Sequence, residues 1–175
     1  LCNVLEADLW INVPHAASND YVAQLANLIR DNLNPNLQVR VEYSNEAWAG
    51  FGSEDYTREQ GLALGLEQGD FPRYGWFGDN EFARFRFYVM RALELHEIFD
   101  ASFGEESHRV YKVLSGWSAF PDLSRVHRDA LSDPLINPNG REIDAYALAP
   151  YFNFTSSGDD EAMLAEVYEA LKGVD

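Results

Sequence analysis

The chain has 175 residues, of which 46% are hydrophobic and 14% aromatic, so it can bury a core and is not intrinsically disordered. Its formal net charge is −16, from 29 acidic and 13 basic residues, and such a surface repels phosphates. We therefore expect no nucleic-acid partner and no membrane partner, and no apolar run approaches the ~20 residues that a membrane-spanning helix needs.

The N-terminal part of the chain predicts a strand followed by a helix. A short apolar run indicates a strand over Asp8–Val13, which ends before Pro14. Ser18 and Asn19 are candidate N-caps for a helix that continues to about Asn32, because its apolar residues recur at helical spacing.

The next strand carries the clearest pattern in the sequence. Over Leu37–Ser44 apolar residues alternate with polar ones, which predicts a strand with one apolar and one polar face. By the same period of two, Glu46 continues the polar face. A long insertion follows this strand, with a short helix near Glu54–Leu66 and a loop rich in glycine and aromatic residues over Gly69–Asn80.

The rest of the chain alternates helices with strands. The strongest helix pattern covers Glu81–Phe103, where apolar residues recur three or four positions apart, and Gly104 is typical of a helix C-terminus. The remaining expected elements are, in order, a strand over Arg109–Ser115, a short helix over Arg125–Leu131, a strand over Ile143–Tyr151 and a helix over Ser157–Lys172. This alternation predicts an α/β fold whose parallel strands are joined by right-handed crossovers.

The single cysteine and the spacing of the histidines limit the chemistry. Cys2 stands alone, which excludes an internal disulfide and a cysteine-based zinc site. His15, His108 and His127 lack the spacing of metal ligands, so we expect no catalytic metal and no cofactor. No secretory leader is visible at Leu1, and the sequence leaves the compartment open.

Polar and aromatic residues gather where the predicted strands end, and in a parallel α/β fold function collects at these carboxyl ends. The candidate site residues are Asn12 and His15 at the first strand, Asn45, Glu46 and Trp48 at the second, Trp117 at the third and Tyr151 at the fourth. This set suits sugar chemistry, because carboxyl groups transfer protons, amides and imidazoles bind hydroxyl groups, and aromatic faces stack on pyranose rings.

The stretch Val41–Trp48, which reads VEYSNEAW, resembles the fourth-strand signature of clan A glycoside hydrolases. In that clan the asparagine binds the sugar 2-hydroxyl and the following glutamate is the general acid/base, so the resemblance implies these roles for Asn45 and Glu46. The stretch ADLWINVPH over Ala7–His15 is similar to a bacterial branch of the same clan. The resemblance implies a partial (half) TIM-type (β/α) barrel over residues 1–175, a single domain that covers about barrel strands three to six.

The clan places its nucleophilic glutamate at the end of a seventh strand, for which this sequence shows no counterpart. The resemblance thus implies a protein that acts on or binds a polysaccharide, with Glu46 as general acid/base of a retaining mechanism whose nucleophile is absent from this chain. The alternatives are a non-catalytic carbohydrate-binding protein and an inactive fragment of a larger hydrolase. Membership of a larger polysaccharide-degrading protein would imply secretion.

A four-stranded piece of a barrel has two open sheet edges. Unpaired edge strands pair readily with other chains, and two sets of four strands give the eight of a closed barrel. We therefore expect a homodimer or a larger homo-oligomer, most simply through a closed two-fold contact.

Overall fold

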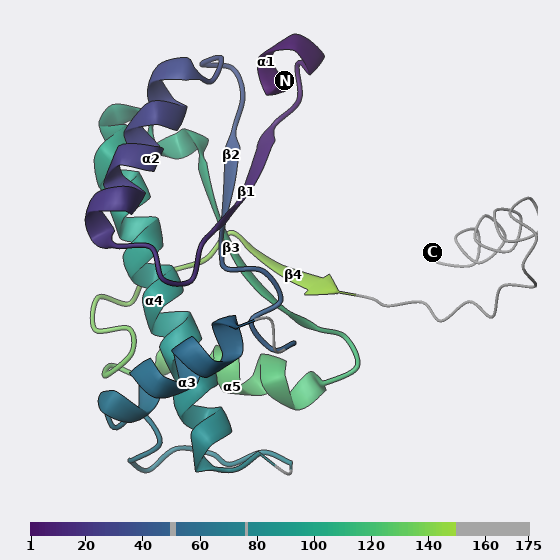
Figure 1. Ribbon diagram of the computed structural model, residues 1–175, viewed down its shortest axis with the longest axis vertical. Helices are drawn as coiled ribbons and strands as arrows, with labels where there is room; N and C mark the ends of the chain where they lie inside the picture. Colours follow the sequence, from purple (N-terminus) through teal and green to yellow (C-terminus); the bar gives the residue numbers. More distant parts are fainter. Residues whose placement is uncertain (50–51, 76, 150–175) are drawn as a thin grey trace, which may run out of the picture.

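The protein is an α/β domain built on one parallel sheet. A computed structural model describes residues 1–49, 52–75 and 77–149 (Figure 1). Its sheet contains the strands β1 (Leu9–Val13), β2 (Val39–Tyr43), β3 (Val110–Trp117) and β4 (Ala145–Ala149), which lie in the order β1-β2-β3-β4 and are all parallel. The four predicted strands are confirmed, and the last two residues predicted for the fourth lie outside the described residues.

Most of the predicted helices are also confirmed. The described helices are α1 (Cys2–Leu5), α2 (Asn19–Asn32), α3 (Ser53–Ala63), α4 (Asp79–Phe103), the 3-10 helix η1 (Gly104–Arg109) and α5 (Pro121–Ser132). Ser18 caps α2, because its side-chain oxygen accepts a hydrogen bond from the Tyr21 amide at 3.2 Å. The sequence pattern did not predict α1 or η1, and the helix expected over Ser157–Lys172 lies outside the described residues.

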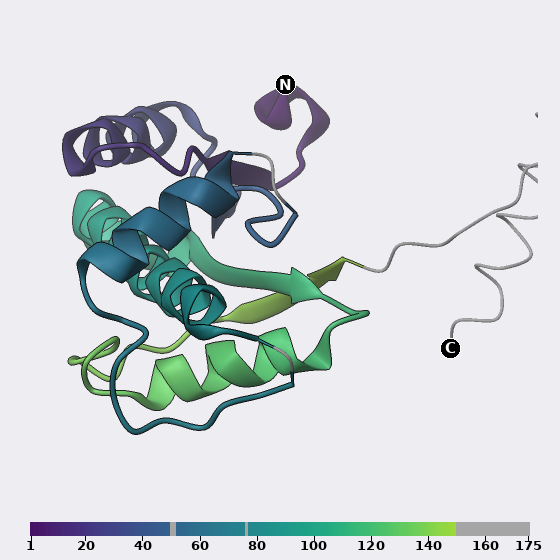
Figure 2. The same cartoon turned by 60° about the horizontal axis from the view of Figure 1, so that its bottom comes forward.

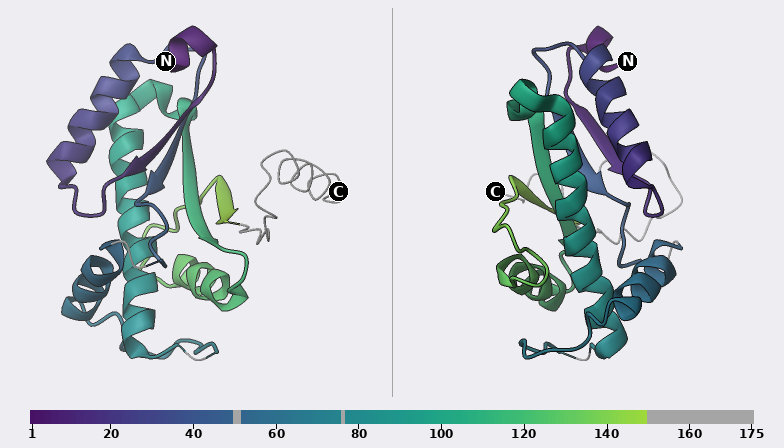
Figure 3. Two further views of the ribbon diagram at one scale, coloured as in Figure 1. Left: turned by 45° about the vertical axis from the view of Figure 1, so that its right-hand side comes forward. Right: turned by 90° about the vertical axis from the view of Figure 1, so that its left-hand side faces the viewer.

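Helices α2 and α4 lie side by side against one face of the sheet (Figure 3). The apolar face of β2 points toward them: Val39, Val41 and Tyr43 are at most 1% exposed, as the alternation predicts. From α4, Nε2 of His96 lies 3.1 Å from the carbonyl oxygen of Val41. The sequential strand order explains this arrangement, because right-handed crossovers between neighbouring parallel strands place their helices on one side.

The opposite face of β1 and β2 is polar. Trp10 is 49% exposed there and donates its indole N–H to the carboxylate of Glu42, at 2.9 Å. Arg40 forms an ion pair with Asp8 at 2.6 Å, and its guanidinium lies 5.4 Å from the centre of the Tyr111 ring. The hydrogen bond from Arg40 holds the pKa of the Asp8 carboxyl below its usual value. None of the described helices is long and apolar enough to span a bilayer.

Helix α3 crosses α4 at close range (Figure 2). At the crossing Gly61 has no room for a side chain. A Cβ atom at Gly61 would lie 2.2 Å from the carbonyl oxygen of Ala83, on the α4 backbone. At an exposed position within a helix, alanine stabilises the helix by about 1 kcal/mol relative to glycine. Here we expect Gly61→Ala to lower the free energy of unfolding by ~1–3 kcal/mol, because the two backbones must separate.

Urea denaturation followed by circular dichroism measures this change. Glu59→Ala, at an exposed position of the same helix, serves as the control and should stay within about 0.5 kcal/mol of the parent. Equal or greater stability of Gly61→Ala would contradict the close approach of α3 and α4.

Candidate functional site

The carboxyl ends of β1 and β2 are tied together by hydrogen bonds. The amide of Asn12 donates to the carbonyl oxygen of Ser44 at 2.8 Å, and the backbone N–H of Ser44 donates to the carbonyl oxygen of Val13 at 2.8 Å. The hydroxyl of Tyr43 donates to the carbonyl oxygen of His15 at 3.0 Å. These bonds hold the chain in a defined path where β2 ends, directly before Asn45.

The turn after β2 corrects one expectation about Glu46. Ser44 has a φ of 63° and Glu46 a φ of 45°, so both residues adopt the left-handed conformation. The pleat of the strand therefore ends at Tyr43, and the period of two does not extend to Glu46. The expectation that Glu46 continues the polar face of β2 is wrong, because a strand's alternation needs extended backbone.

A polar hollow of about 210 Å³ lies at these strand ends. Its lining residues are Asn12, Val13, Pro14, His15, Ser44, Asn45 and Ser53. The ring of His15 packs on that of Tyr56, with centroids 5.3 Å apart, which orients the imidazole at the wall. The sequence interpretation missed Ser53, which is 2% exposed and begins α3. Its position directly before two acidic residues is typical of a helix start and carries no signal of binding.

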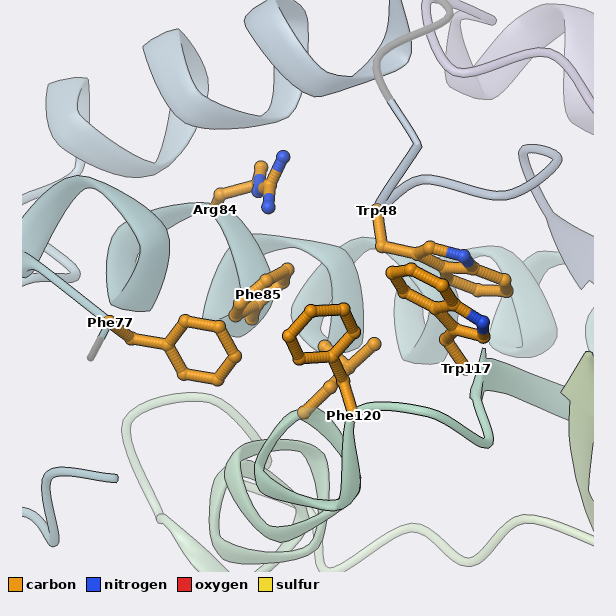
Figure 4. Close-up of a pocket in the computed structure, with 7 residues that line it drawn as sticks. Trp48, Phe77, Arg84, Phe85, Trp117 and Phe120 are labelled. Carbon is orange, nitrogen blue, oxygen red and sulfur yellow. The ribbon is translucent and has the colours of Figure 1, made fainter. Parts of the chain in front are cut away.

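An aromatic hollow of about 140 Å³ lies beyond the turn (Figure 4). Its lining residues are Trp48, Phe77, Arg84, Phe85, Trp117, Phe120 and Leu123. They come from the turn after β2, the segment before α4, the first turns of α4, the end of β3 and the start of α5. Figure 4 shows the indoles of Trp48 and Trp117 next to each other at one end of this hollow.

The predicted site residues are therefore divided between two hollows near the carboxyl edge of the sheet. Asn12, His15 and Asn45 line the polar hollow, whereas Trp48 and Trp117 line the aromatic one. Glu46 is partly buried and lies in the turn that joins Asn45 to Trp48. Tyr151 lies outside the described residues.

A series of hydrogen-bonded and stacked polar side chains adjoins the aromatic hollow, where the ring of His127 lies 6.0 Å from that of Phe85. The Tyr88 hydroxyl accepts a hydrogen bond from the Ser115 backbone N–H at 2.9 Å and lies 2.9 Å from the Ser115 hydroxyl. The ring of His127 stacks on that of Tyr88 at 4.9 Å, and its Nδ1 lies 2.9 Å from the Tyr146 hydroxyl. Burial lowers the pKa of His127 to about 3, so the imidazole is neutral and packs as a core residue.

No group of three or more histidine, cysteine or carboxylate side chains that could hold a metal ion occurs among the described residues. Comparisons of the chain with family models, with curated proteins and with solved structures find no match. The evidence for function therefore lies in the geometry of the two hollows and of the turn between them.

Proposed function

We propose that this chain is a glycoside hydrolase-like domain that binds a polysaccharide and in which Glu46 acts as the general acid/base of a retaining mechanism. Asn45 binds a sugar hydroxyl beside the bond to be cleaved, and the amide of Asn12 and the imidazole of His15 bind further hydroxyl groups in the polar hollow. A retaining mechanism needs a second carboxylate ~5–5.5 Å from Glu46, and we propose that it comes from outside this chain.

The observation that supports this proposal most strongly is the position of the Asn45–Glu46 pair. The pair lies one residue beyond β2 at the carboxyl edge of a parallel sheet, and Ser44, which precedes it, is hydrogen-bonded to Asn12 and Val13 of β1. On one side lies a hollow lined by amide, imidazole and hydroxyl groups, which are the partners that sugar hydroxyls need. On the other side lie two indoles, which offer apolar faces.

The sheet also supports the proposal that this α/β fold is half of a TIM-type barrel. Barrel strands are parallel and follow one another in sequence order with their helices outside, and the four described strands and α2 and α4 are arranged in this way. The insertion that contains α3 separates β2 from α4, as expected. In a barrel the polar face with Trp10, Arg40 and Glu42 would point to the interior, where other strands cover it.

We propose that a second copy of the chain supplies these strands. Sedimentation at micromolar concentration is then expected to give twice the 19.8 kDa mass of one chain. Trp10→Arg should shift the equilibrium to monomer, since it places a charge on the covered face, whereas Tyr21→Arg on the outer surface of α2 should not. A 19.8 kDa species at every concentration would contradict the dimer.

Sugar binding is tested by isothermal titration with cellohexaose, xylohexaose, mannohexaose and laminarihexaose. We expect one of these to bind and Asn45→Ala to weaken its binding about tenfold, because the lost hydrogen bond leaves a sugar hydroxyl without its partner. Asn36→Ala, an exposed asparagine at the opposite end of β2, is the matched control and should bind as the parent does. Equal affinity of the two variants would contradict the assignment of Asn45.

The non-catalytic alternative makes a separate prediction within the same experiment. Described residues form the turn at Asn45 and Glu46 and line the polar hollow, whereas the nucleophile is not assigned to any described residue. Binding of an oligosaccharide that is never cleaved, even at high protein concentration, would favour a carbohydrate-binding protein over an enzyme.

A further inference from the structure

Five aromatic side chains among the described residues border the aromatic hollow and approach it from different elements (Figure 4). The rings of Phe77 and Phe85 meet edge to face, with centroids 5.1 Å apart and planes at 69°. At the strand ends, the rings of Trp117 and Phe120 lie 4.5 Å apart at 51°. Trp48 completes the wall beside Trp117. The rings therefore already use the tilted and edge-to-face contacts that aromatic groups prefer.

The size of the hollow matches one six-membered ring. Its volume is about 140 Å³, and apolar protein cavities of ~150 Å³ accept benzene. Leu123, which is 2% exposed, forms part of the wall on the α5 side and adds an aliphatic contact. A disaccharide or a longer chain would not fit within this volume.

The charge around the hollow is already balanced. Arg84 is the only charged residue among the described residues that line it, and it is 5% exposed. Its guanidinium forms ion pairs with Glu54, at 2.8 Å, and with Glu81, and it lies 4.5 Å from the centre of the Phe85 ring. A ligand that enters the hollow therefore meets ring faces and edges, while the buried cation keeps its two carboxylate partners.

This environment discriminates between classes of ligand. A sugar ring would lose hydrogen bonds between several hydroxyl groups and water, and a carboxylate would lose its hydration. The few unpartnered donors among the described lining residues, such as the buried Nε1–H of Trp48, cannot replace all of these hydrogen bonds. A neutral aromatic ring loses little on leaving water and gains contacts of the kind that the lining rings make with one another.

We propose that the aromatic hollow binds a single neutral aromatic ring, such as a phenyl or phenol group. The ring site follows from the geometry of the aromatic hollow, whereas the identity of the whole ligand rests on the proposed function. An aryl group held by Trp48 would lie next to the turn that carries Glu46. The ligand at this edge would then be a saccharide that bears an aryl substituent, with its sugar in the polar hollow and its ring in the aromatic one.

Fluorine NMR of 4-fluorophenol in the presence of the protein tests the ring site directly. We expect saturable line broadening with a Kd of ~1 mM or lower, which is ordinary for so small a ligand. Trp48→Leu and Phe120→Leu should each weaken binding about three- to tenfold, because each removes one aromatic partner. Tyr21→Leu, an exposed aromatic position on α2, is the matched control and should bind as the parent does.

The charge of the probe provides a second comparison. 4-Fluorobenzoate should bind at least about tenfold more weakly than 4-fluorophenol, because its carboxylate must be desolvated. The proposal is overturned if 4-fluorophenol shows no saturable binding to the folded protein up to ~20 mM, or if both leucine variants, verified as folded by circular dichroism, bind it with unchanged affinity.

Failure of this proposal can be separated from failure of the proposed function. Loss of oligosaccharide binding with retained binding of 4-fluorophenol would reject the sugar site and keep the ring site. Binding of an oligosaccharide by a protein that does not bind 4-fluorophenol would reject the ring site alone.

Discussion

In an assembly that supplies the nucleophilic carboxylate, Glu46→Gln is expected to reduce hydrolysis of the oligosaccharide that binds best by 10²–10⁴-fold, the usual contribution of a general acid/base. Glutamine has nearly the same shape as glutamate but cannot deliver a proton to the departing oxygen. The affinity for the oligosaccharide should stay within about threefold, because Asn45 and the polar hollow are unchanged. Single-turnover hydrolysis and isothermal titration measure the two quantities separately.

The leaving group of the substrate provides the sharper test of this role. In a 2,4-dinitrophenyl glycoside of the same sugar the 2,4-dinitrophenolate leaves without protonation, so transfer of the sugar to the nucleophile should be much less affected by Glu46→Gln than cleavage of the oligosaccharide. Glu59→Gln, at an exposed site on α3, is the control and should leave the rates of cleavage of both substrates unchanged. Equal losses for the two substrates, or full activity of Glu46→Gln on the oligosaccharide, would contradict the acid/base assignment.

The free energy of unfolding is expected to fall steeply as the pH drops from about 6.5 to 4, because two neutral histidines are buried in the core. His96 and His127 are each 1% exposed, and burial lowers their pKa values to about 4 and about 3. In the unfolded chain both titrate near pH 6.5.

The sign follows from the number of protons that each state binds. Between pH 6.5 and 4 the unfolded chain takes up protons at both histidines and the folded protein does not, so acid favours unfolding. The stability is therefore fully present above pH 6.5 and is lost as the pH falls toward the two folded pKa values. By pH 4 the uptake of protons at each histidine of the unfolded chain is expected to lower the free energy of unfolding by about 3 kcal/mol. The two losses together are a large part of the ~5–15 kcal/mol that stabilises a typical domain.

Urea denaturation at pH 4.5, 5.5, 6.5 and 7.5 tests this expectation, with pH values chosen to cover the window between folded and unfolded pKa. His127→Gln removes one of the two titrating groups and should flatten the pH dependence, even though it also lowers stability at neutral pH. His108→Gln, an exposed position in η1, is the matched control and should keep the full slope. A parent protein whose stability does not change between pH 7.5 and 4.5 would contradict the burial of both imidazoles.

The candidate site could be predicted from the sequence only in part. The sequence places Asn12, Asn45 and Trp117 near strand ends because each strand is bounded by local signals, and parallel strands bring those ends to one edge. It does not show that the residues separate into a polar and an aromatic hollow. That division depends on how the turn after β2 bends and on where the first turns of α4 and α5 pack, and both depend on contacts between distant parts of the chain.

The sequence by itself determined the order and type of the four strands and of the helices α2, α3, α4 and α5. The alternation over Val39–Tyr43, the cap at Ser18 and the helical spacing within α4 each depend on residues a few positions apart, so they can be recognised without knowing the fold. The parallel α/β class then follows from the alternation of strands and helices.

Only the tertiary structure decided the features that depend on distant contacts. The left-handed turn at Ser44 is held by hydrogen bonds with β1, and Ser53 reaches the polar hollow because of where α3 begins. Gly61 is required because the backbone of Ala83 lies against it, although the sequence alone indicates only that glycine destabilises a helix. In each case the partner is remote in sequence, and a local pattern contains no information about which remote backbone or side chain a residue will meet.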